Sequence, residues 1–572
     1  MYPRWMIRIY GKDATMGTVS NRETKESEEE PMNMTNTAQT ANGGTVDRRA
    51  FLKAFGASAA VATLGLTACA PKSLSDTGAE AAPGASGTYT WDEEYDVIVA
   101  GAGIAGITAA LTVATEGDGA TCLLLEKDAT PNGNSPFCAG YSIFNRDPEN
   151  HAVYLKALVG ESTPEDVMEA FAQEMTNNLD WLYEIGAQQD WIVATEPDPA
   201  KEPTWEYPEL PNQTYHGSFV FDLEKGPGHI HQFLEDTLEQ HGDIITYKTS
   251  TPLEELVRDP GTGEIVGVIA DGKRYGARRG VIMCTGGFES DPDMLYNYTG
   301  VRGYPYAGKA NTGDGHRACM KVGADFWHMH GGAQYWMGPR NLDNTAFMST
   351  VWNFTTKQCG ITVGINGRRF YNDYDGCAAP FPANNPEGNL STSVGYRHGI
   401  TNFGGHWTHL PMPEKAWFVF DQAGLEAGAI PAELTADPVA DGWALRCDTL
   451  EELAEAIEVP AAELARTVEQ WNLFCKEGTD LAFYRPSDTL TPVTTGPFYA
   501  MLCAPALLNT DGGPVRNAQG EILDPDGNPI PGLFSAGEFG SVWGHMYQGA
   551  GNVAECMAFG RISARSALAR VS

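Results

Sequence analysis

Closely spaced cysteines are missing from this sequence. The chain has eleven cysteines among 572 residues, but it contains no CxxC motif, no CxxCH motif and no paired spacing typical of metal ligands. Such motifs usually hold c-type haem, zinc or iron–sulfur clusters. We therefore expect the protein to carry no haem and no metal site of its own.

Positive charge is also scarce. Lysine and arginine number 38 against 74 aspartates and glutamates, a formal net charge of −36. A chain of this charge repels the phosphates of nucleic acids and the anionic surface of a membrane, so we expect no nucleic-acid partner. The length exceeds what one hydrophobic core usually fills, which favours two domains or one large domain with an insertion.

Long apolar runs are rare, and the one near the N-terminus is too short to span a bilayer comfortably. It follows Arg48 and Arg49 in "DRRAFLKAFGASAAVATLGLTACAPK" and ends at Ala68-Cys69. The segment resembles a twin-arginine export signal that ends in a lipoprotein cleavage box. The alternative is a buried core helix preceded by a chance arginine pair.

This resemblance implies a signal over residues 1–69, with the true start at Met32 or Met34, and a small, polar, flexible linker over 70–92. It further implies a lipid anchor on Cys69 that holds the protein at the outer face of the cytoplasmic membrane. Ordinary cleavage near Ala68 would instead release a soluble protein.

A glycine-rich motif begins at Tyr95, in "YDVIVAGAGIAGITAALTVATEGDGATCLLLEKD". An apolar strand (96–100) leads into Gly101-x-Gly103-x-x-Gly106 and a helix, and a second strand (122–125) ends in Glu126, 25 residues after Gly101. In such units the glycines allow a tight turn, close approach to a pyrophosphate and close helix packing, while the acid accepts hydrogen bonds from a ribose. The pattern predicts a dinucleotide site.

Further small and amide residues occur far along the chain, in "PNGNSPFCAGY" (131–141), "GVIMCTGGFESD" (280–291) and "GLFSAGEFG" (532–540). Segments this widely spread suit one extended cofactor, and the chain has no second GxGxxG for a nicotinamide. FAD is therefore favoured over NAD.

The same segments, together with "TGDG" (312–315), "GRRFYND" (367–373), "PIPGLFSAGE" (529–538) and a glycine-rich loop near the C-terminus, resemble a known family. That family contains soluble fumarate reductases, urocanate-type enoate reductases and 3-ketosteroid dehydrogenases, all FAD-dependent oxidoreductases. The resemblance implies an α/β protein with a discontinuous Rossmann-like FAD-binding domain (93–328 and 506–572) and an inserted α+β substrate-capping domain (329–505). It implies FAD-binding roles for Gly101, Gly103, Ile104, Ala105, Gly106, Glu126, Lys127, Asn134, Ser135, Thr285, Gly286, Gly287, Asp314, Gly537, Glu538, Gly549 and Asn552.

Inside the inserted part, the spacing of Leu450, Leu453, Ile457 and Leu464 predicts amphipathic helix within residues 448–478.

The C-terminal loop "WGHMYQGAGNVAE" (543–555) departs from the fumarate reductases, which resemble one another in placing an arginine here and a histidine before a "GG" strand. This loop has no arginine, and "APALLNTD" precedes Gly512-Gly513 without a histidine. The loop instead resembles that of ketosteroid dehydrogenases, in which a tyrosine and the glycine four places on bind a substrate ketone. Tyr547 and Gly551 have this spacing, although Tyr547 packing over the flavin is the simpler alternative.

The proton-transfer residue is left open by the sequence. In the family it lies five residues after the asparagine of the "RF-N-E/D" motif, where this chain has Cys377. We rank Tyr374 first, Arg397 second and Cys377 third. Aromatic residues that would line an apolar pocket, or belong to a core, are Tyr335, Trp336, Trp352 and Phe354.

The sequence thus predicts an exported FAD enzyme that reduces the C=C bond of an α,β-unsaturated carbonyl compound, with an apolar enone such as a steroid or plant phenolic favoured over fumarate. Electrons would come from a separate cytochrome or quinol-linked protein, as in anaerobic respiration. Alternatives are a 3-ketosteroid-type dehydrogenase, a urocanate- or cinnamate-like enoate reductase that uses Arg397 or Arg340, and a lipid-anchored flavoprotein that only relays electrons.

Overall fold

The structure, a computed structural model, describes residues 89–201, 207–221, 228–347, 359–373, 400–403, 406–409, 412–432 and 434–571. The export signal, its Cys69 and most of the 70–92 linker lie outside these residues. So do the three predicted proton-transfer residues, Tyr374, Cys377 and Arg397, and the aromatic residues Trp352 and Phe354.

A sheet with a parallel core carries the glycine-rich motif. Its strands lie in the order β20-β21-β9-β1-β2-β6, with β20 antiparallel at one edge and the β7–β8 hairpin joined antiparallel to β9. The last four residues of β1 and all of β2 are buried, as expected for strands covered on both faces. The strands are β1 (Glu93–Ala100), β2 (Cys122–Leu125), β6 (Ile245–Lys248), β7 (Leu253–Arg258), β8 (Ile265–Ala270), β9 (Lys273–Met283), β20 (Glu521–Leu523) and β21 (Pro529–Ser535).

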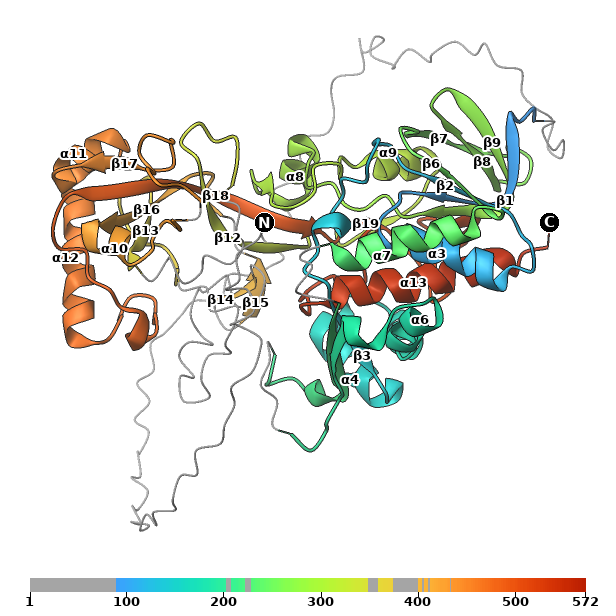
Figure 1. Cartoon of the computed structure of the whole chain (residues 1–572), viewed down its shortest axis with the longest axis horizontal. Helices are drawn as coiled ribbons and strands as arrows, with labels where there is room; N and C mark the ends of the chain where they lie inside the picture. The colour runs from blue at the N-terminus through green and yellow to red at the C-terminus, as the bar shows by residue number, and fades with distance from the viewer. Residues whose placement is uncertain are drawn as a thin grey trace, which may run out of the picture. The chain divides into compact units, whose positions relative to one another are not determined.

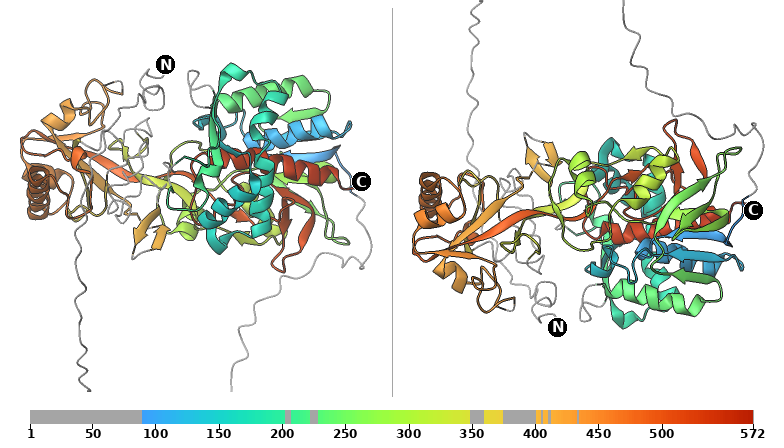
Figure 2. Two further views of the ribbon diagram at one scale, coloured as in Figure 1. Left: turned by 90° about the horizontal axis from the view of Figure 1, so that it is seen from below. Right: turned by 90° about the horizontal axis from the view of Figure 1, so that it is seen from above.

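Three helices pack side by side next to this sheet, as three directions of view show (Figures 1 and 2). They are α3 (Ile104–Glu116), α7 (His229–Leu238) and α13 (Gly551–Leu568). Gly560 allows α13 to approach α3 closely, because a Cβ there would lie 2.9 Å from the carbonyl oxygen of Ala105. The C-terminal helix is thereby fixed against the helix that follows the glycine-rich turn.

Further helices and a small antiparallel sheet of order β3-β5-β4 belong to the same region. Their bounds are α4 (Pro148–Val159), α5 (Glu165–Met175), α6 (Asn178–Glu184), β3 (Tyr141–Asn145), β4 (Ile192–Thr195) and β5 (His216–Phe221). Asn178 of α6 donates a hydrogen bond to the carbonyl of Ala554, 3.0 Å away, and so helps to hold the start of α13.

A second sheet, largely antiparallel, has helices of its own. Its strands are β10 (Tyr304–Pro305), β12 (Gly332–Arg340), β13 (Ile361–Gly364), β16 (Ala416–Asp421), β17 (Leu445–Cys447) and β18 (Phe498–Thr510). Its helices are α10 (Gln422–Glu426), α11 (Leu450–Ala456) and α12 (Ala461–Glu477). The amphipathic pattern of 448–478 is confirmed, but it is divided into two helices because Glu458 has a left-handed backbone (φ 59°) and Pro460 follows.

The long strand β18 joins the two predicted domains. It pairs with β16 along its first part and with β12 along a stretch that reaches Thr510, and it is continuous between them (Figure 2). The predicted boundary at 505/506 therefore falls inside a strand and not in a linker. The domain limits stay a prediction, while the predicted α/β class is confirmed by the parallel sheet and its helices.

The remaining elements are short. They are α8 (Pro292–Thr299), α9 (Asp314–Lys321), β11 (Phe326–Trp327), β19 (Gly513–Pro514), β14 (Ile400–Phe403) and β15 (His406–His409). Among the helices that the structure describes, none combines the length and apolarity needed to cross a bilayer.

Candidate active site

The glycine-rich turn has the geometry that its sequence predicts. Gly101 has a φ of +102°, and a Cβ there would lie 2.3 Å from the carbonyl oxygen of Cys284. A Cβ on Gly106 would lie 1.8 Å from the carbonyl oxygen of Gly101. Only glycine permits this contact between α3 and the turn, which leaves the first amides of α3 at the carboxyl end of β1.

The start of α3 is suited to an anion. No side chain within the helix caps it, and the Ile104 amide donates to Ser135 Oγ at 3.0 Å. Free amides and the helix dipole attract a phosphate at such an end. Ser135, a predicted cofactor residue, thus lies directly at the predicted pyrophosphate position.

Glu126 directly follows β2 and stabilises the turn. Its Oε2 accepts a hydrogen bond from the Ala102 amide at 3.1 Å, and its Oε1 accepts one from the Asp128 amide at 3.0 Å. An ionised carboxylate has about four acceptor positions, so lone pairs remain for the hydroxyls of a ribose.

These elements line a cavity that is open to solvent at the carboxyl ends of the parallel strands, with a volume of about 820 Å³ that includes part of the open space. Ligands of open α/β sheets bind in this crevice. The predicted cofactor residues that line it are Gly101, Gly103, Ile104, Ala105, Glu126, Lys127, Asn134, Ser135, Thr285, Gly286, Asp314 and Glu538.

Other predicted residues lie behind the cavity wall. Gly106 serves the close packing described above, and a Cβ on Gly537 (φ +70°) would lie 2.8 Å from the Cβ of Ala105. A Cβ on Gly287 would lie 2.2 Å from Thr510 Oγ1. These three positions shape the site through the backbone. Gly549 and Asn552 belong to the loop before α13 and to its first turn.

Asn134 joins two acidic side chains at the cavity region, which come from the segments that follow strands β9 and β21. Its Nδ2 donates to Glu289 Oε1 at 2.9 Å and to Glu538 Oε1 at 3.1 Å. Desolvation raises the pKa of Glu289, and desolvation together with the charge of Glu289 raises the pKa of Glu538 well above its usual value. Asn134 and Glu538 were predicted from the sequence, whereas Glu289, which directly follows Thr285-Gly286-Gly287-Phe288, was not.

Lys127 and Asp314 form an ion pair at the cavity wall. The Lys127 ammonium lies 2.6 Å from Asp314 Oδ2 and donates to Thr312 Oγ1 at 2.7 Å. This pair ties the end of β2 to the start of α9. Their direct contact with a cofactor stays a prediction.

The site has polar groups that an extended dinucleotide would satisfy. Thr285 Oγ1, in the cavity wall, and Asn552 Oδ1, in the first turn of α13, are both buried without a hydrogen-bond partner in the described part of the chain. Buried polar groups are nearly always paired in folded proteins. With the glycine cradle and the open start of α3, they fit FAD.

The Tyr547 loop is held firmly at the start of α13. The Tyr547 ring meets Trp543 edge to face with centroids 5.8 Å apart, its carbonyl accepts from the Tyr207 hydroxyl at 2.8 Å, and only 6% of the residue is exposed. The Gly551 amide donates to the Gln548 carbonyl at 2.8 Å. A ligand oxygen at Gly551 would therefore share that amide, and the joint role of Tyr547 and Gly551 stays a prediction.

Two histidines that were not predicted as site residues lie at this loop, His328 beside it and His545 within it. His328 is buried, and its ring nitrogens are 2.7 Å from the Ser541 carbonyl and 2.9 Å from the Ser162 carbonyl. His545 is exposed, and partial desolvation together with His330 lowers its pKa. Two features of the sequence could have identified these histidines. They are the "HMHGG" motif (328–332) and the position of His545 within the loop 543–555.

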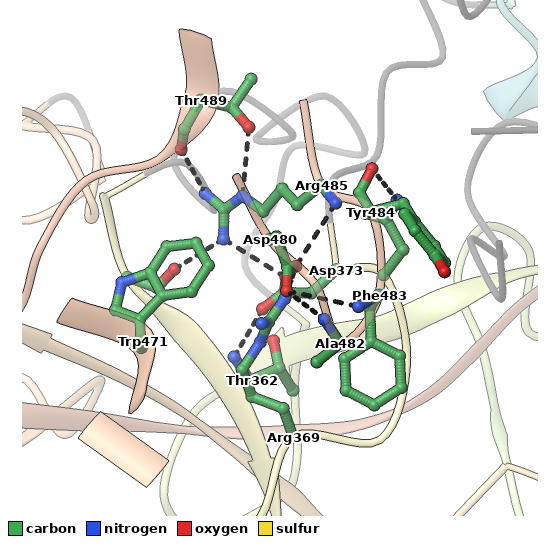
Figure 3. Close-up of polar contacts among 12 residues, drawn as sticks. Thr362, Arg369, Asp373, Trp471, Asp480, Ala482, Phe483, Tyr484, Arg485 and Thr489 are labelled. Atoms are coloured by element: carbon green, nitrogen blue, oxygen red, sulfur yellow. Dashed lines mark hydrogen bonds and ion pairs between the residues drawn. The ribbon is translucent and has the colours of Figure 1, made fainter. Parts of the chain in front are cut away.

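A buried ion network lies where the predicted proton-transfer loop begins (Figure 3). Asp373, the last described residue before that loop, lies 3.3 Å from Arg485 Nη1 and 3.4 Å from Arg369 Nη2. Arg369 also lies 2.8 Å from Asp480, whose carboxylate accepts the amides of Ala482 and Phe483. The "GRRFYND" motif therefore has a structural role in this domain.

Arg340, considered as a carboxylate clamp, is already engaged. Its guanidinium lies 3.9 Å from the centroid of the Tyr304 ring and 4.3 Å from that of Phe347, and its Nε donates to Asn344 Oδ1 at 2.6 Å. It is 4% exposed. This arrangement stabilises the end of β12 and leaves little of the cation for a ligand.

Comparison with known proteins supports the same cofactor, FAD. A model of the family described as FAD binding domain matches residues 96–553. The chain is 28% identical to the digoxin reductase of Eggerthella lenta, over 91% of this chain and 97% of that protein. It is 27% identical to the urocanate reductase of the same organism, over 94% and 84%, and 25% identical to a 3-oxosteroid 1-dehydrogenase of Mycolicibacterium smegmatis, over 83% and 97%.

Solved structures share the fold. A 3-ketosteroid delta1-dehydrogenase from Sterolibacterium denitrificans has a TM-score of 0.65 at 21% identity, covering 83% of this chain and all (100%) of that one. A 3-ketosteroid-delta4-(5alpha)-dehydrogenase from Rhodococcus jostii has a TM-score of 0.58 at 24% identity, covering 85% and 99%. The chain belongs to the FAD-binding domain family and is an FAD-dependent oxidoreductase that acts on carbon–carbon bonds.

Proposed function

We propose that this protein is an exported reductase of the C=C bond of α,β-unsaturated carbonyl compounds, with an apolar enone as its substrate. Bound FAD supplies the hydride for such a reaction. The chain's own part is to bind the enone beside the flavin and to polarise its carbonyl. The similarity to proteins named digoxin reductase and 3-oxosteroid 1-dehydrogenase supports this substrate class.

The observation that carries the proposal is the loop before α13. Within residues 541–552, all of which the structure describes, there is a buried tyrosine and a helix start but neither arginine nor lysine. A neutral phenol, with a pKa of about 10 in its unperturbed state, and the amides at a helix N-terminus suit a ketone oxygen better than a carboxylate. In the proposal Tyr547 and Gly551 donate to that oxygen.

A carboxylate-bearing enoate is the second candidate, because the chain is also similar to a protein named urocanate reductase. The cationic side chains that the structure describes give little support to a carboxylate-bearing substrate. Arg340 is engaged by Asn344 and two aromatic rings, and desolvation together with His330 lowers the pKa of His545, which disfavours its charged form. Arg397 lies outside the described residues and is the cation that this candidate would need.

The direction of the reaction depends on the electron partner. The same residues serve an oxidative 3-ketosteroid-type dehydrogenase, which is the runner-up. In the proposal a separate cytochrome or quinol-linked protein reduces the enzyme at the outer face of the cytoplasmic membrane, and the enzyme is exported by the twin-arginine route and held there by lipid on Cys69. The sequence of residues 1–69 supports this location.

An anaerobic reoxidation experiment tests the proposal. The flavin of the purified holoenzyme is reduced with a viologen, and then steroid enones, phenolic enones, cinnamate-like acids and urocanate are added in turn while the flavin absorbance is followed. Rapid reoxidation by enones but not by acids is expected. Reoxidation by the acids alone would favour the enoate reductase, and reoxidation by protein partners without any enone turnover would indicate an electron relay.

A further inference from the structure

Glu289, which is buried, and Glu538, which is half-buried, form a carboxyl pair at the cofactor cavity. Strands β9 and β21 are adjacent and parallel, with Ser535 opposite Met283, so the segments that follow them leave the same edge of the sheet. Glu289 follows the first strand and Glu538 the second. The crevice at this edge is where the cofactor binds.

One amide group bridges the two carboxyls. Asn134 Nδ2 lies 2.9 Å from Glu289 Oε1, and 3.1 and 3.2 Å from the two oxygens of Glu538. The carboxyl groups are therefore within about 6 Å of one another. A Cβ on Gly287 would touch both, at 2.4 Å from Glu289 Oε2 and 2.8 Å from Glu538 Oε1, so both lie against the same glycine.

The side chains that donate hydrogen bonds to this pair are neutral. Glu289, which is 1% exposed, accepts from Asn134, from Asn311 Nδ2 at 2.7 Å and from Thr510 Oγ1 at 3.1 Å. In the described ranges no lysine, arginine or histidine forms an ion pair with either carboxyl. Two desolvated carboxylates at this distance without a cation repel each other, which favours one shared proton on the pair over two ionised groups.

Of the other charged groups around the pair, the nearby acid Asp511 further raises the pKa of Glu538, and the nearby cation is engaged elsewhere. Asp511, which is buried and bonded to Asn509 Nδ2 at 2.8 Å, adds a third acid, and desolvation raises its pKa well above the usual range. The nearby cation, Arg516, is bound by Glu555 and donates to the Gly537 carbonyl at 3.0 Å.

The remaining titratable neighbours are neutral. His316 lies 2.9 Å from the Gly512 carbonyl, and burial lowers its pKa to about 4. Burial raises the pKa of the Cys284 thiol to about 12 and that of the Cys556 thiol well above its usual value.

An independent observation marks the same wall as a ligand contact. Glu538 lines the cavity together with Thr285, whose buried Oγ1 lacks a partner in the described part of the chain. A group bound in the cavity would thus lie beside the pair. Electrons delivered to that group add negative charge next to a pair that already carries one.

We propose that the Glu289–Glu538 pair takes up one proton from solvent when the bound FAD receives two electrons, and releases it when the flavin is reoxidised. The pair changes from one negative charge to none, while the electrons come from the external donor and pass to the flavin. The proton on the carboxyl pair thereby compensates part of the negative charge that the electrons bring to the flavin. This inference depends on FAD binding and not on the identity of the substrate.

Proton counting tests it. The holoenzyme is titrated anaerobically at pH 7, in weak buffer with a pH indicator dye, with electrochemically reduced methyl viologen, which carries no proton. The wild type is expected to take up about one proton more per flavin than Glu289→Gln/Glu538→Gln, which has no titratable group at these positions. Asp511→Asn, a matched buried acid, and the exposed Glu239→Gln are expected to match the wild type.

Equal proton uptake by the wild type and the double variant, or a loss of the extra proton in Asp511→Asn, would overturn the assignment. If the double variant does not retain FAD, infrared difference spectra of the wild type decide. A protonated-carboxyl band that grows on reduction and shifts in heavy water supports the proposal. Unchanged carboxyl bands contradict it.

Discussion

Gly106 shows how one residue type can decide cofactor binding. Its Cα lies so close to Gly101 that a Cβ would be 1.8 Å from the carbonyl oxygen, and the clashing atom belongs to the backbone. No side-chain rotation can relieve that contact. The start of α3, with its open amides, can therefore keep its place only with glycine here.

Gly106→Ala is expected to abolish FAD binding, because α3 must move away from the phosphate position. The bound flavin absorbance of the purified variant measures this, with Gly242→Ala as the control, since the nearest atom to a Cβ there is 3.8 Å away. An alanine variant that retained FAD at wild-type affinity would show that the turn is not the pyrophosphate site.

Tyr547→Phe is expected to lower turnover of an enone about a hundredfold or more, because the variant loses one donor to the developing oxyanion. FAD content should stay unchanged, because the ring still packs on Trp543. Steady-state kinetics at saturating substrate measures the effect, and Tyr298→Phe, at an exposed position, is the control. Full activity of Tyr547→Phe would assign the tyrosine to packing.

At the scale of elements, the second sheet depends on charges that neutralise one another. The side chains of Asp373, Asp480 and Arg485 are fully buried, and Arg369 is nearly so at 5% (Figure 3). Breaking a buried ion pair by removing one partner leaves an uncompensated charge, which costs more than the pair contributes. The network connects β13 and the segment after α12 through hydrogen bonds to the Gly360 carbonyl and the Thr362 amide.

Arg485→Met is expected to lower the free energy of unfolding by about 3–5 kcal/mol, because Asp373 then keeps only Arg369 as a cation. Urea denaturation monitored by tryptophan fluorescence measures this. The control is Arg368→Met, which breaks an exposed pair with Glu463 and should leave stability unchanged. Equal stability of both variants would show that the network contributes little.

Two histidines pack between α4 and β5. The rings of His151 and His216 lie 5.5 Å apart beside Tyr154, whose hydroxyl is bonded to Gln548 in the Tyr547 loop. Burial lowers the pKa of His216 to about 4, and burial together with His216 lowers that of His151 well below its usual value. The folded state therefore binds fewer protons than the unfolded state between about pH 4 and 6.5.

The neutral His216 therefore leaves the free energy of unfolding at its full value above about pH 6.5. This free energy declines as the pH falls from 6.5 toward 4, because the unfolded state binds the proton more tightly. His216→Phe is expected to remove up to about 1.4 kcal/mol per pH unit of this decline. Urea denaturation at pH 7, 6 and 5, with FAD in constant excess, compares the slopes, and His241→Phe is the control. Parallel slopes for wild type and His216→Phe would mean that this imidazole is not kept neutral by folding.

At the scale of the whole molecule, the net charge influences which electron-transfer partners approach the protein. The formal net charge of −36 repels anions over a distance of about a Debye length, roughly 8 Å at physiological salt. A partner that delivers electrons to this protein is therefore expected to present a positive surface.

Reduction of the flavin by a basic cytochrome is expected to slow as salt rises from 10 to about 300 mM, because screening removes the steering. An acidic electron-transfer protein should show the opposite trend. Stopped-flow rates at several ionic strengths measure both. Rates that do not depend on salt for either protein would indicate that docking is not guided by net charge.

The sequence by itself determined the parts of this protein that arise from short stretches of chain. The β1–α3–β2 unit, its glycines and Glu126 lie within a few dozen residues, so turn geometry and apolar pattern specify them locally. The same holds for the amphipathic pattern around α11 and α12, although the division into two helices at Glu458 and Pro460 was found only in the structure.

Only the tertiary structure decided which distant residues meet. Asn134 is 155 residues from Glu289 and 404 from Glu538 along the chain, yet one amide contacts both carboxyls. No local pattern records such a meeting, because it depends on the order of the parallel strands β2, β9 and β21. The physical reason is that strand order brings chain segments together regardless of their separation in sequence.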